Sequence, residues 1–217
     1  MEKTTSLEIS ERKLQSIPAE IGETGNSLTR LKIYRQNLGT LPAWIGRLAA
    51  LEELNINGCF QNLKLPESMG NLSSLRAPTL SRIKMDSFPG WIGNLRNLQY
   101  LALINNTICE IPSFIKNLCN LRMLVIHGNP LKTFPPISGL SALETLYIAG
   151  TDISEIPEWI VSLESLKELF IHDNHLKDLP DSFGKMAKLE TLYLDGNDIL
   201  NLPNGFLKPA MLKRIEI

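Results

Sequence analysis

Residues 189–199 read LETLYLDGNDI, and Leu202 and Pro203 follow shortly after. The first six residues of this segment alternate apolar and polar side chains, which is typical of a β-strand with one buried face. Asn197 comes where the chain must turn, and its short amide can bond backbone groups of its own turn and of neighbouring turns. The Leu-Pro pair then prevents the strand from continuing. The segment therefore predicts a short strand, an asparagine-bound turn and a return path.

This unit recurs along the whole chain. An apolar residue followed by proline returns every 22 to 24 residues, and a ladder of leucines has the same period. The prolines are Pro18, Pro42, Pro66, Pro89, Pro112, Pro135, Pro157, Pro180 and Pro203, and the leucines are Leu28, Leu51, Leu75, Leu98, Leu121, Leu143, Leu166, Leu189 and Leu212. Self-similarity at a fixed period in this range is the signature of a stacked repeat architecture. We expect a single array over residues 1–217, with about nine units and the start of a tenth.

The unit also predicts how the array is built. Its LxxLxL stretch points leucines inward and the intervening side chains outward. Strands of successive units pair in parallel because every unit takes the same path, and stacking gives a continuous core that one unit cannot form alone. Strands crowd together on one side, so the sheet is expected to be concave. The predicted fold class is an α/β-type repeat solenoid with a convex side of short helical or irregular arcs.

The consensus LxxLxLxxNxLxxLPxxIGxL resembles the 23-residue leucine-rich repeats of Ras-group and Scribble-type proteins. It is similar as well to repeats of plant immune receptors and of bacterial host-interacting proteins. The resemblance covers essentially all 217 residues. It implies a leucine-rich-repeat horseshoe that binds other proteins, usually on the concave face, although a fold does not by itself define a partner.

The pattern breaks at several places. The asparagine position is filled by Asn106, Asn129, Asn174 and Asn197, but by Arg12, Gln36, Cys59, Ile83 and Thr151 in the other units. Ile83 cannot make the side-chain bonds, and Pro78 stands where a strand leucine is expected and removes a ladder donor. Residues 57–90 are therefore expected to form an irregular junction, which is either tolerated drift or a change of curvature or a partner contact.

Composition excludes several classes of function. Lys and Arg number 22 against 23 for Asp and Glu, so the net charge attracts neither nucleic acid nor an anionic membrane. No apolar run is long enough to span a bilayer, and we expect no membrane insertion. The sequence shows no signal peptide, which predicts a cytoplasmic protein, or a secreted or surface-exposed one if a signal peptide has been removed. Cys59, Cys109 and Cys119 lack the spacing of a disulfide framework or a zinc site.

No catalytic motif interrupts the repeats. The chain has no GxxxxGK[ST], HExxH, GxSxG or EF-hand pattern, and the repeats leave no room for a catalytic domain. His127 and His172 occupy the same strand position two units apart, and at about 4.8 Å per strand they are too far apart to share a metal. Asp195 lies one strand from His172, but no third ligand is evident. We expect no enzymatic activity, no cofactor and no metal site.

The outward strand positions differ between the two halves of the chain. In the first half they are charged or small, and in the second half they become apolar and aromatic. The candidate partner-binding residues on the concave face are Tyr100, Met123, Val125, His127, Tyr147, Phe170, His172 and Tyr193. Three of them, Tyr147, Phe170 and Tyr193, hold the same position in consecutive strands and are expected to stand side by side.

Two interpretations of this surface remain open. Aromatic residues suit strands and stabilise their cross-strand neighbours. Alternatively, large apolar groups on a solvated sheet face mark a surface that a partner covers. Trp44, Trp91 and Trp159 lie two residues after repeat prolines, where they either seal the convex arcs or form a second interface.

We predict a protein–protein recognition scaffold that binds on the concave face. The alternatives are a ligand-sensing or targeting segment of a larger receptor or effector, and a carbohydrate binder. The expected partner is a protein and not nucleic acid. Self-association is a further expectation, because residues 213–217 read as an uncovered strand whose open edge can pair with another chain.

Overall fold

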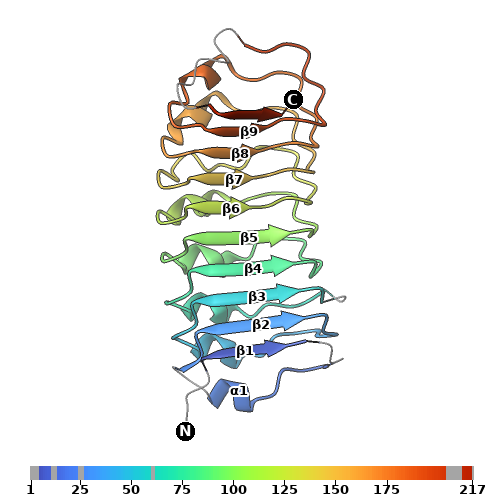
Figure 1. Ribbon diagram of the computed structural model, residues 1–217. Coiled ribbons are helices and arrows are strands. Elements are labelled where there is room, and N and C mark those ends of the chain that lie inside the picture. The colour runs from blue at the N-terminus through green and yellow to red at the C-terminus, as the bar shows by residue number, and fades with distance from the viewer. Residues whose placement is uncertain (1–4, 11–13, 24–26, 60–61, 204–211, 217) are drawn as a thin grey trace. The chain divides into compact units, whose positions relative to one another are not determined.

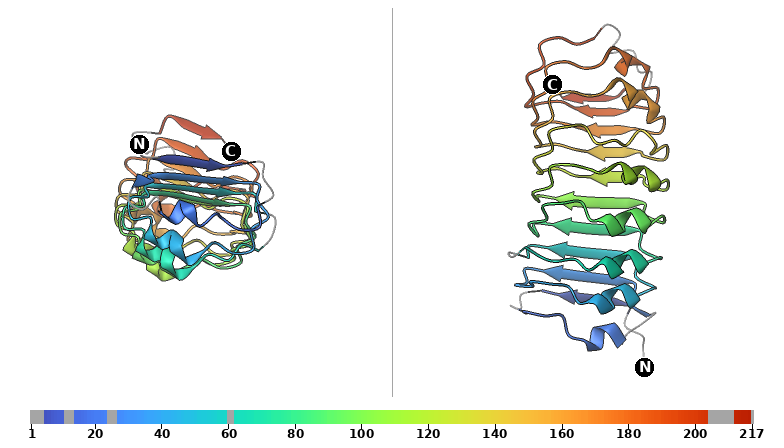
Figure 2. Two further views of the ribbon diagram at one scale, coloured as in Figure 1. Left: turned by 90° about the horizontal axis from the view of Figure 1, so that it is seen from below. Right: turned by 180° about the vertical axis from the view of Figure 1, so that it is seen from behind.

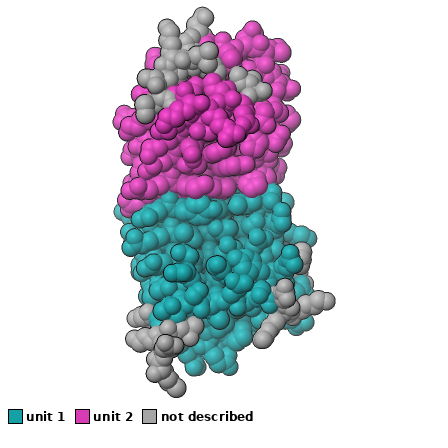
Figure 3. Space-filling model, viewed as in Figure 1, with its two compact units in different colours: residues 1–107 teal, residues 108–217 magenta. Residues whose placement is uncertain are grey.

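A computed structural model describes residues 5–10, 14–23, 27–59, 62–203 and 212–216. Arg12, one of the substituted asparagine positions, lies outside them. The chain divides into two compact units, Met1–Thr107 and Ile108–Ile217, which Figure 3 shows in different colours. Each unit is a stack of repeats and is described by itself below.

In the first unit, five strands form a parallel sheet in sequence order (Figure 1). They are β1 (Ser6–Ile9), β2 (Arg30–Tyr34), β3 (Glu53–Asn57), β4 (Ala77–Ser81) and β5 (Tyr100–Ile104). Short helices cover the other side, as the view from behind in Figure 2 shows. They are the α-helix α1 (Glu20–Glu23) and the 3₁₀ helices η2 (Ala43–Arg47), η3 (Glu67–Asn71) and η4 (Gly90–Asn94).

The second unit repeats this arrangement with shorter strands. They are β6 (Met123–Val125), β7 (Thr145–Tyr147), β8 (Glu168–Phe170), β9 (Thr191–Tyr193) and β10 (Arg214–Glu216). The 3₁₀ helices on its arc side are η5 (Ser113–Asn117), η6 (Glu158–Ser162) and η7 (Asp181–Lys185). The predicted repeat solenoid, with parallel strands on one side and short helical arcs on the other, is therefore confirmed.

The repeat proline starts each 3₁₀ helix. Pro42, for example, has φ −69° and ψ 145° and is the residue directly before η2. Its carbonyl accepts the N–H of Ile45 at 3.1 Å, and the N–H of Leu48 bonds Ile45 in turn, which closes a single tight turn. The same geometry follows the other prolines that precede the 3₁₀ helices.

The leucines fill the interior of each stack. Leu31 and Leu54 in the first unit, and Leu146, Leu169 and Leu192 in the second, have no exposed surface. Successive leucines stand in register on neighbouring strands, so each repeat buries its apolar face against the next. The strand phase inferred from the sequence is correct.

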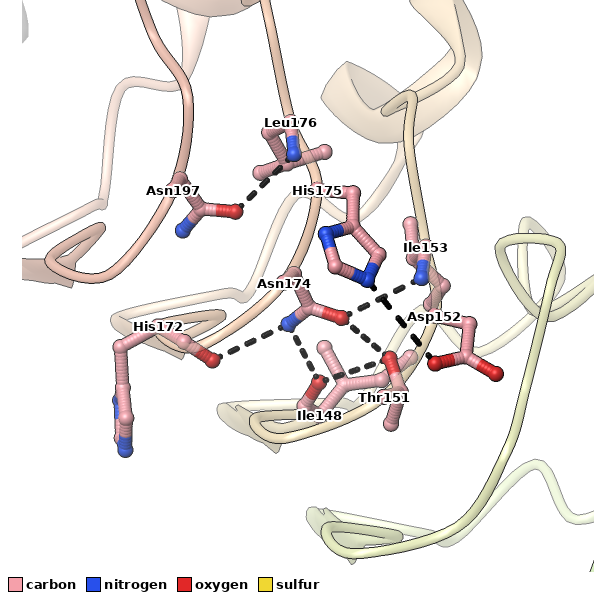
Figure 4. A network of polar contacts seen from close by, with 9 residues as sticks. All are labelled: Ile148, Thr151, Asp152, Ile153, His172, Asn174, His175, Leu176 and Asn197. Carbon is pink, nitrogen blue, oxygen red and sulfur yellow. Dashed lines mark hydrogen bonds and ion pairs between the residues drawn. The ribbon is translucent and has the colours of Figure 1, made fainter.

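Asparagines join neighbouring turns, as Figure 4 shows for Asn174. Its Oδ1 accepts the N–H of Ile153, 3.3 Å away in the preceding repeat, and the hydroxyl of Thr151. Its Nδ2 donates to the carbonyls of Ile148 and Ile171 at 3.1 and 3.0 Å. Because Asn174 is 3% exposed, these bonds satisfy backbone groups that water cannot reach.

Each asparagine serves the repeat before its own. Asn106 accepts the N–H groups of Ile83 and Met85, and Asn129 accepts that of Ile108. This explains how Ile83 can occupy the asparagine position. Its own side chain makes no polar bonds, but Asn106 of the following repeat binds its backbone.

The expectation of an irregular junction over residues 57–90 is wrong for the strand within it. β4 is regular, and Pro78 is buried opposite Leu54 in the place of the missing leucine. The register with β5 begins only at Thr79, so the absent N–H precedes that ladder. The described irregularity lies in the following turn, where Lys84 has φ of 55°; the positive φ of Arg82 recurs at the same position of other repeats, for example at Arg35 and Asn105.

The tryptophans lie on the arc side of their units. Trp91 is 1% exposed. Trp159 meets Phe134 edge to face at a centroid distance of 5.6 Å. These contacts agree with the interpretation that the rings seal gaps between arcs.

Candidate functional site

The outward residues at the carboxyl end of each strand form one column across the second unit. In register, they are Val125, Tyr147, Phe170, Tyr193 and Glu216. Three consecutive members are aromatic and half-buried. Tyr147, Phe170 and Tyr193 are called the aromatic row below, and the surface that carries them is called the outer sheet face.

The rings of the aromatic row stack on one another. The centroids of Tyr147 and Phe170 are 4.9 Å apart at an interplanar angle of 18°, and those of Phe170 and Tyr193 are 4.9 Å apart at 15°. The separation is close to the spacing of neighbouring strands, so the sheet itself sets the stack. The Phe170 ring has a neighbouring ring on both faces, and the stack presents ring edges to solvent.

Two histidines line the row on one side. The ring of His127 meets Tyr147 at a centroid distance of 5.2 Å, and that of His172 meets it at 5.5 Å and 81°. His172 Nε2 lies 3.4 Å from the hydroxyl of Tyr147. His172 Nδ1 is buried and has no hydrogen-bond partner among the described residues. The two histidines therefore hold the Tyr147 ring in place on the side of the row toward the carboxyl ends of the strands.

Arg214 closes the row at β10. Its guanidinium carbon lies 5.0 Å from the centre of the Tyr193 ring, and its Nη2 pairs with Glu216 at 2.5 Å. The hydrogen bond with Glu216 raises the pKa of Arg214 above its usual value. The sequence analysis missed this residue, although its spacing from Thr191 by one repeat would have placed it on the outer sheet face.

Three carboxylates flank the aromatic row. Glu168 precedes Phe170 on β8, and it accepts the hydroxyl of Thr145 at 2.9 Å. Asp173 and Asp195 follow on the other side of the row and are exposed. Asp173 has φ of 53°, and its carboxylate lies over Gly196 of the next repeat. None of the three forms an ion pair with another described residue.

A separate ladder of charges precedes the strands of the second unit. Its members alternate in sign from repeat to repeat, and they are Arg122, Glu144, Lys167, Glu190 and Lys213. Lys167 Nζ lies 2.6 Å from Glu144, and Lys213 Nζ lies 2.8 Å from Glu190. These lysines hold the pKa values of Glu144 and Glu190 below their usual range, chiefly through the hydrogen bonds. The basic groups nearest the row are therefore already paired.

The predicted contact residues do not all behave alike. Met123, like the rings of the row, is half-buried on its strand. Val125 lies in the predicted column but is only 6% exposed, so it contributes little surface to a partner. Its short side chain stands opposite the much larger Tyr147. Tyr100 belongs to β5 in the first unit.

The first unit has a polar outer sheet face. Its middle column, in register, is Glu8, Lys32, Asn55, Thr79 and Ala102. A hollow of about 410 Å³ opens at the ends of these strands, lined by Glu8, Ser10, Tyr34, Arg35, Asn57 and Arg82. Arg35 and Arg82 both have positive φ, and Gly58 lies between them in the repeat order.

The described residues offer little for catalysis or metal binding. They contain no group of three or more His, Cys, Asp or Glu side chains placed to hold a metal ion. His175 and Asp152 lie 4.0 Å apart in the turns and are both exposed (Figure 4). Burial raises the pKa of the Cys59 thiol, which makes it a poor nucleophile at neutral pH. Within the described part, no helix is long and apolar enough to cross a membrane.

Residues 141–199 match the family model described as "Leucine rich repeat". They include β7, β8 and β9 with their aromatic row. Residues 141–199 are therefore leucine-rich repeats, and the chain has the leucine-rich-repeat fold. The leucines of the repeat consensus recur in both compact units and are buried in both.

Solved structures of leucine-rich-repeat proteins share the fold. An internalin from Listeria monocytogenes superposes with a TM-score of 0.78 at 20% identity, over 98% of this chain and 60% of its own. The ectodomain of the Arabidopsis thaliana receptor kinase GASSHO1/SCHENGEN3, in complex with CASPARIAN STRIP INTEGRITY FACTOR 2, gives 0.77 at 30% identity. The alignment covers 96% of this chain and 26% of that ectodomain.

A plant peptide hormone receptor, RGFR1 in complex with RGF2, gives a TM-score of 0.70 at 24% identity. It is covered over 39% of its length, and this chain over 98%. The chain thus spans less than two thirds of each of these proteins. No curated protein sequence gave a significant match.

Proposed function

We propose that this leucine-rich-repeat protein recognises a peptide segment of a protein partner on the outer sheet face of its second unit. The aromatic row carries the proposal. Three large rings in consecutive strands are held rigid by stacking, so they lose little conformational freedom when a partner covers them. Half-buried aromatic groups on a solvated sheet face are the expected anchors of an interface.

The structural relatives support a peptide or protein as the partner. The two plant receptors named above were solved in complex with CASPARIAN STRIP INTEGRITY FACTOR 2 and with RGF2. The chain shares their repeat fold. Binding of a peptide to a rigid sheet face therefore needs no structural element beyond those described.

The stacking geometry weakens the carbohydrate alternative. Sugars pack on the open face of an aromatic ring, but both faces of Phe170 are covered by Tyr147 and Tyr193. Arg214 also lies over the Tyr193 ring. Ring edges carry partial positive charge, so they favour carbonyl oxygens and apolar side chains of a peptide.

Selection from a library of random dodecapeptides displayed on phage tests the proposal. The whole chain is the bait, and each recovered peptide is measured against Phe170→Ala plus Tyr193→Ala. We expect peptides that bind the wild type and lose affinity for the double variant. Lys32→Ala plus Thr79→Ala, at the same column of the first unit, is the matched control and should leave their affinity unchanged. If all recovered peptides bind the double variant equally well, the aromatic row is not the site.

A further inference from the structure

The carboxylates beside the aromatic row point to the chemistry of the partner. We propose that the second unit binds a basic segment, in which lysine or arginine side chains reach Asp173, Asp195 and Glu168. This inference rests on the proposed function, because the same outer sheet face is the docking surface. It adds a charge requirement that the aromatic rings alone do not impose.

The charges on this face are unbalanced. Its outward acidic residues on and just after the strands are Glu168, Asp173, Asp195 and Glu216, and the outward basic residue on those strands is Arg214. Arg214 is paired with Glu216, so the other three carboxylates determine the local charge. Asp173 and Asp195 are exposed, and they can meet a partner without reorganisation of the sheet.

The unit's own nearby basic residues do not neutralise these groups. Arg122 and Lys167 both pair with Glu144, and Lys213 pairs with Glu190. The charged residues of the ladder therefore pair with one another and not with the carboxylates beside the aromatic row. The carboxylates that flank the row remain without ionic partners among the described residues.

The arrangement also suits an extended segment. Glu168 lies two residues before Phe170, about 7 Å along β8, and Asp173 follows in the turn after β8, so the two carboxylates lie on opposite flanks of Phe170. Side chains of an extended peptide lying along the row alternate between these two flanks. Basic side chains can thus meet carboxylates on both sides while their aliphatic stems pack on the ring edges.

The stack offers an internal example of this contact. Arg214 places its guanidinium against the Tyr193 ring and pairs with the neighbouring Glu216. Phe170 has no free ring face, so a partner arginine there would pair with the carboxylates and pack its aliphatic stem on the ring edge. Guanidinium groups are well suited to such sites because they are planar and weakly hydrated.

The row-dependent dodecapeptides test the inference through their composition and their affinity. We expect lysine and arginine to be enriched over the starting library. For a synthetic peptide from that set, Asp173→Asn plus Asp195→Asn should weaken binding roughly tenfold or more. Asparagine at position 173 keeps a residue that tolerates positive φ. The control Glu155→Gln plus Asp178→Asn removes the same number of exposed charges in this unit, outside the strands, and should leave the affinity within about twofold.

Raising the salt concentration from about 50 to about 500 mM should weaken wild-type binding and leave the Asp173→Asn plus Asp195→Asn variant less affected. Row-dependent peptides with neutral or acidic composition would overturn the basic-segment inference alone. Unchanged affinity in the aspartate variant would do the same. If no recovered peptide depends on Phe170 and Tyr193, the proposed function fails together with this inference.

Discussion

The two units bury the same kind of residue and expose different ones. The corresponding outward column is Glu8, Lys32, Asn55, Thr79 and Ala102 in the first unit, and Val125, Tyr147, Phe170, Tyr193 and Glu216 in the second. From β2 to β9, the residue that follows this column is a buried apolar side chain with at most 1% exposure. Strand alternation thus separates the residues that hold the fold from those that can define a partner, and the second set varies without cost to the first.

The charges differ in the same way. Outward charged residues of the first unit are Glu8, Arg30, Lys32, Arg35, Glu53 and Arg82, of which four are basic. The second unit has four acidic groups and one basic group on its face. Surfaces of opposite sign attract different segments and affect association rate more than they affect the fold.

The largest effect should come from the shared interior. Leu169→Ala in the second unit and Leu54→Ala in the first each remove a fully buried side chain. Both should lower the free energy of unfolding by about 2–5 kcal/mol. Glu168→Ala, one residue away on the outer face, should change it by less than about 0.5 kcal/mol. Urea unfolding midpoints decide the matter, and equal shifts for leucine and glutamate would show that the strand phase is wrong.

The asparagine position should show a smaller effect that differs between units. Asn174→Ala leaves several buried backbone groups without partners and should cost about 1–3 kcal/mol. Cys59→Ala, at the same position in the first unit, removes a small buried thiol and should cost less. The same urea titrations measure both variants. A larger loss for Cys59→Ala would indicate that packing, and not hydrogen bonding, sets the role of this position.

The charge ladder should give the smallest effect, with a defined pH dependence. The folded-state pKa of Glu144 is lowered, so its stabilising contribution is present above the unfolded-state value near 4.5 and is lost as pH falls through the folded-state value. Glu144→Gln should therefore be slightly less stable than the wild type at pH 7. The two proteins should converge in strongly acidic solution. Unfolding midpoints across this range would contradict the account if the difference persisted or grew at low pH.

Much of the fold could be predicted from the sequence because each feature of the repeat recurs many times along the chain. The period, the inward leucines and the asparagine position all agree with the structure. The expectation that the repeat prolines end the strands is wrong, because β2 already ends at Tyr34, well before Pro42; the prolines instead mark where each 3₁₀ turn begins. The irregularity predicted from Pro78 was wrong for β4. A missing N–H donor disrupts a sheet only where a ladder hydrogen bond would form, and that depends on the register with β5.

The site was predictable only in part. Strand phase brought Tyr147, Phe170 and Tyr193 together, but ring orientation depends on packing that the phase does not define. Val125 shows the same limit, because its exposure is set by the size of its neighbours. The alternating charge ladder did have a sequence signal. Its members recur once per repeat with opposite signs, and alignment of the repeats by column reveals them.

The most direct measurement compares stability and peptide affinity on the same samples of the Phe170→Ala plus Tyr193→Ala variant. If the rings serve recognition and not the fold, the double variant should lose only about 1 kcal/mol of stability. Its affinity for a row-dependent dodecapeptide should fall roughly a hundredfold or more. Full affinity in a folded double variant would contradict the assignment of the site. An unfolded double variant would contradict the separation between outward and inward residues on which the account depends.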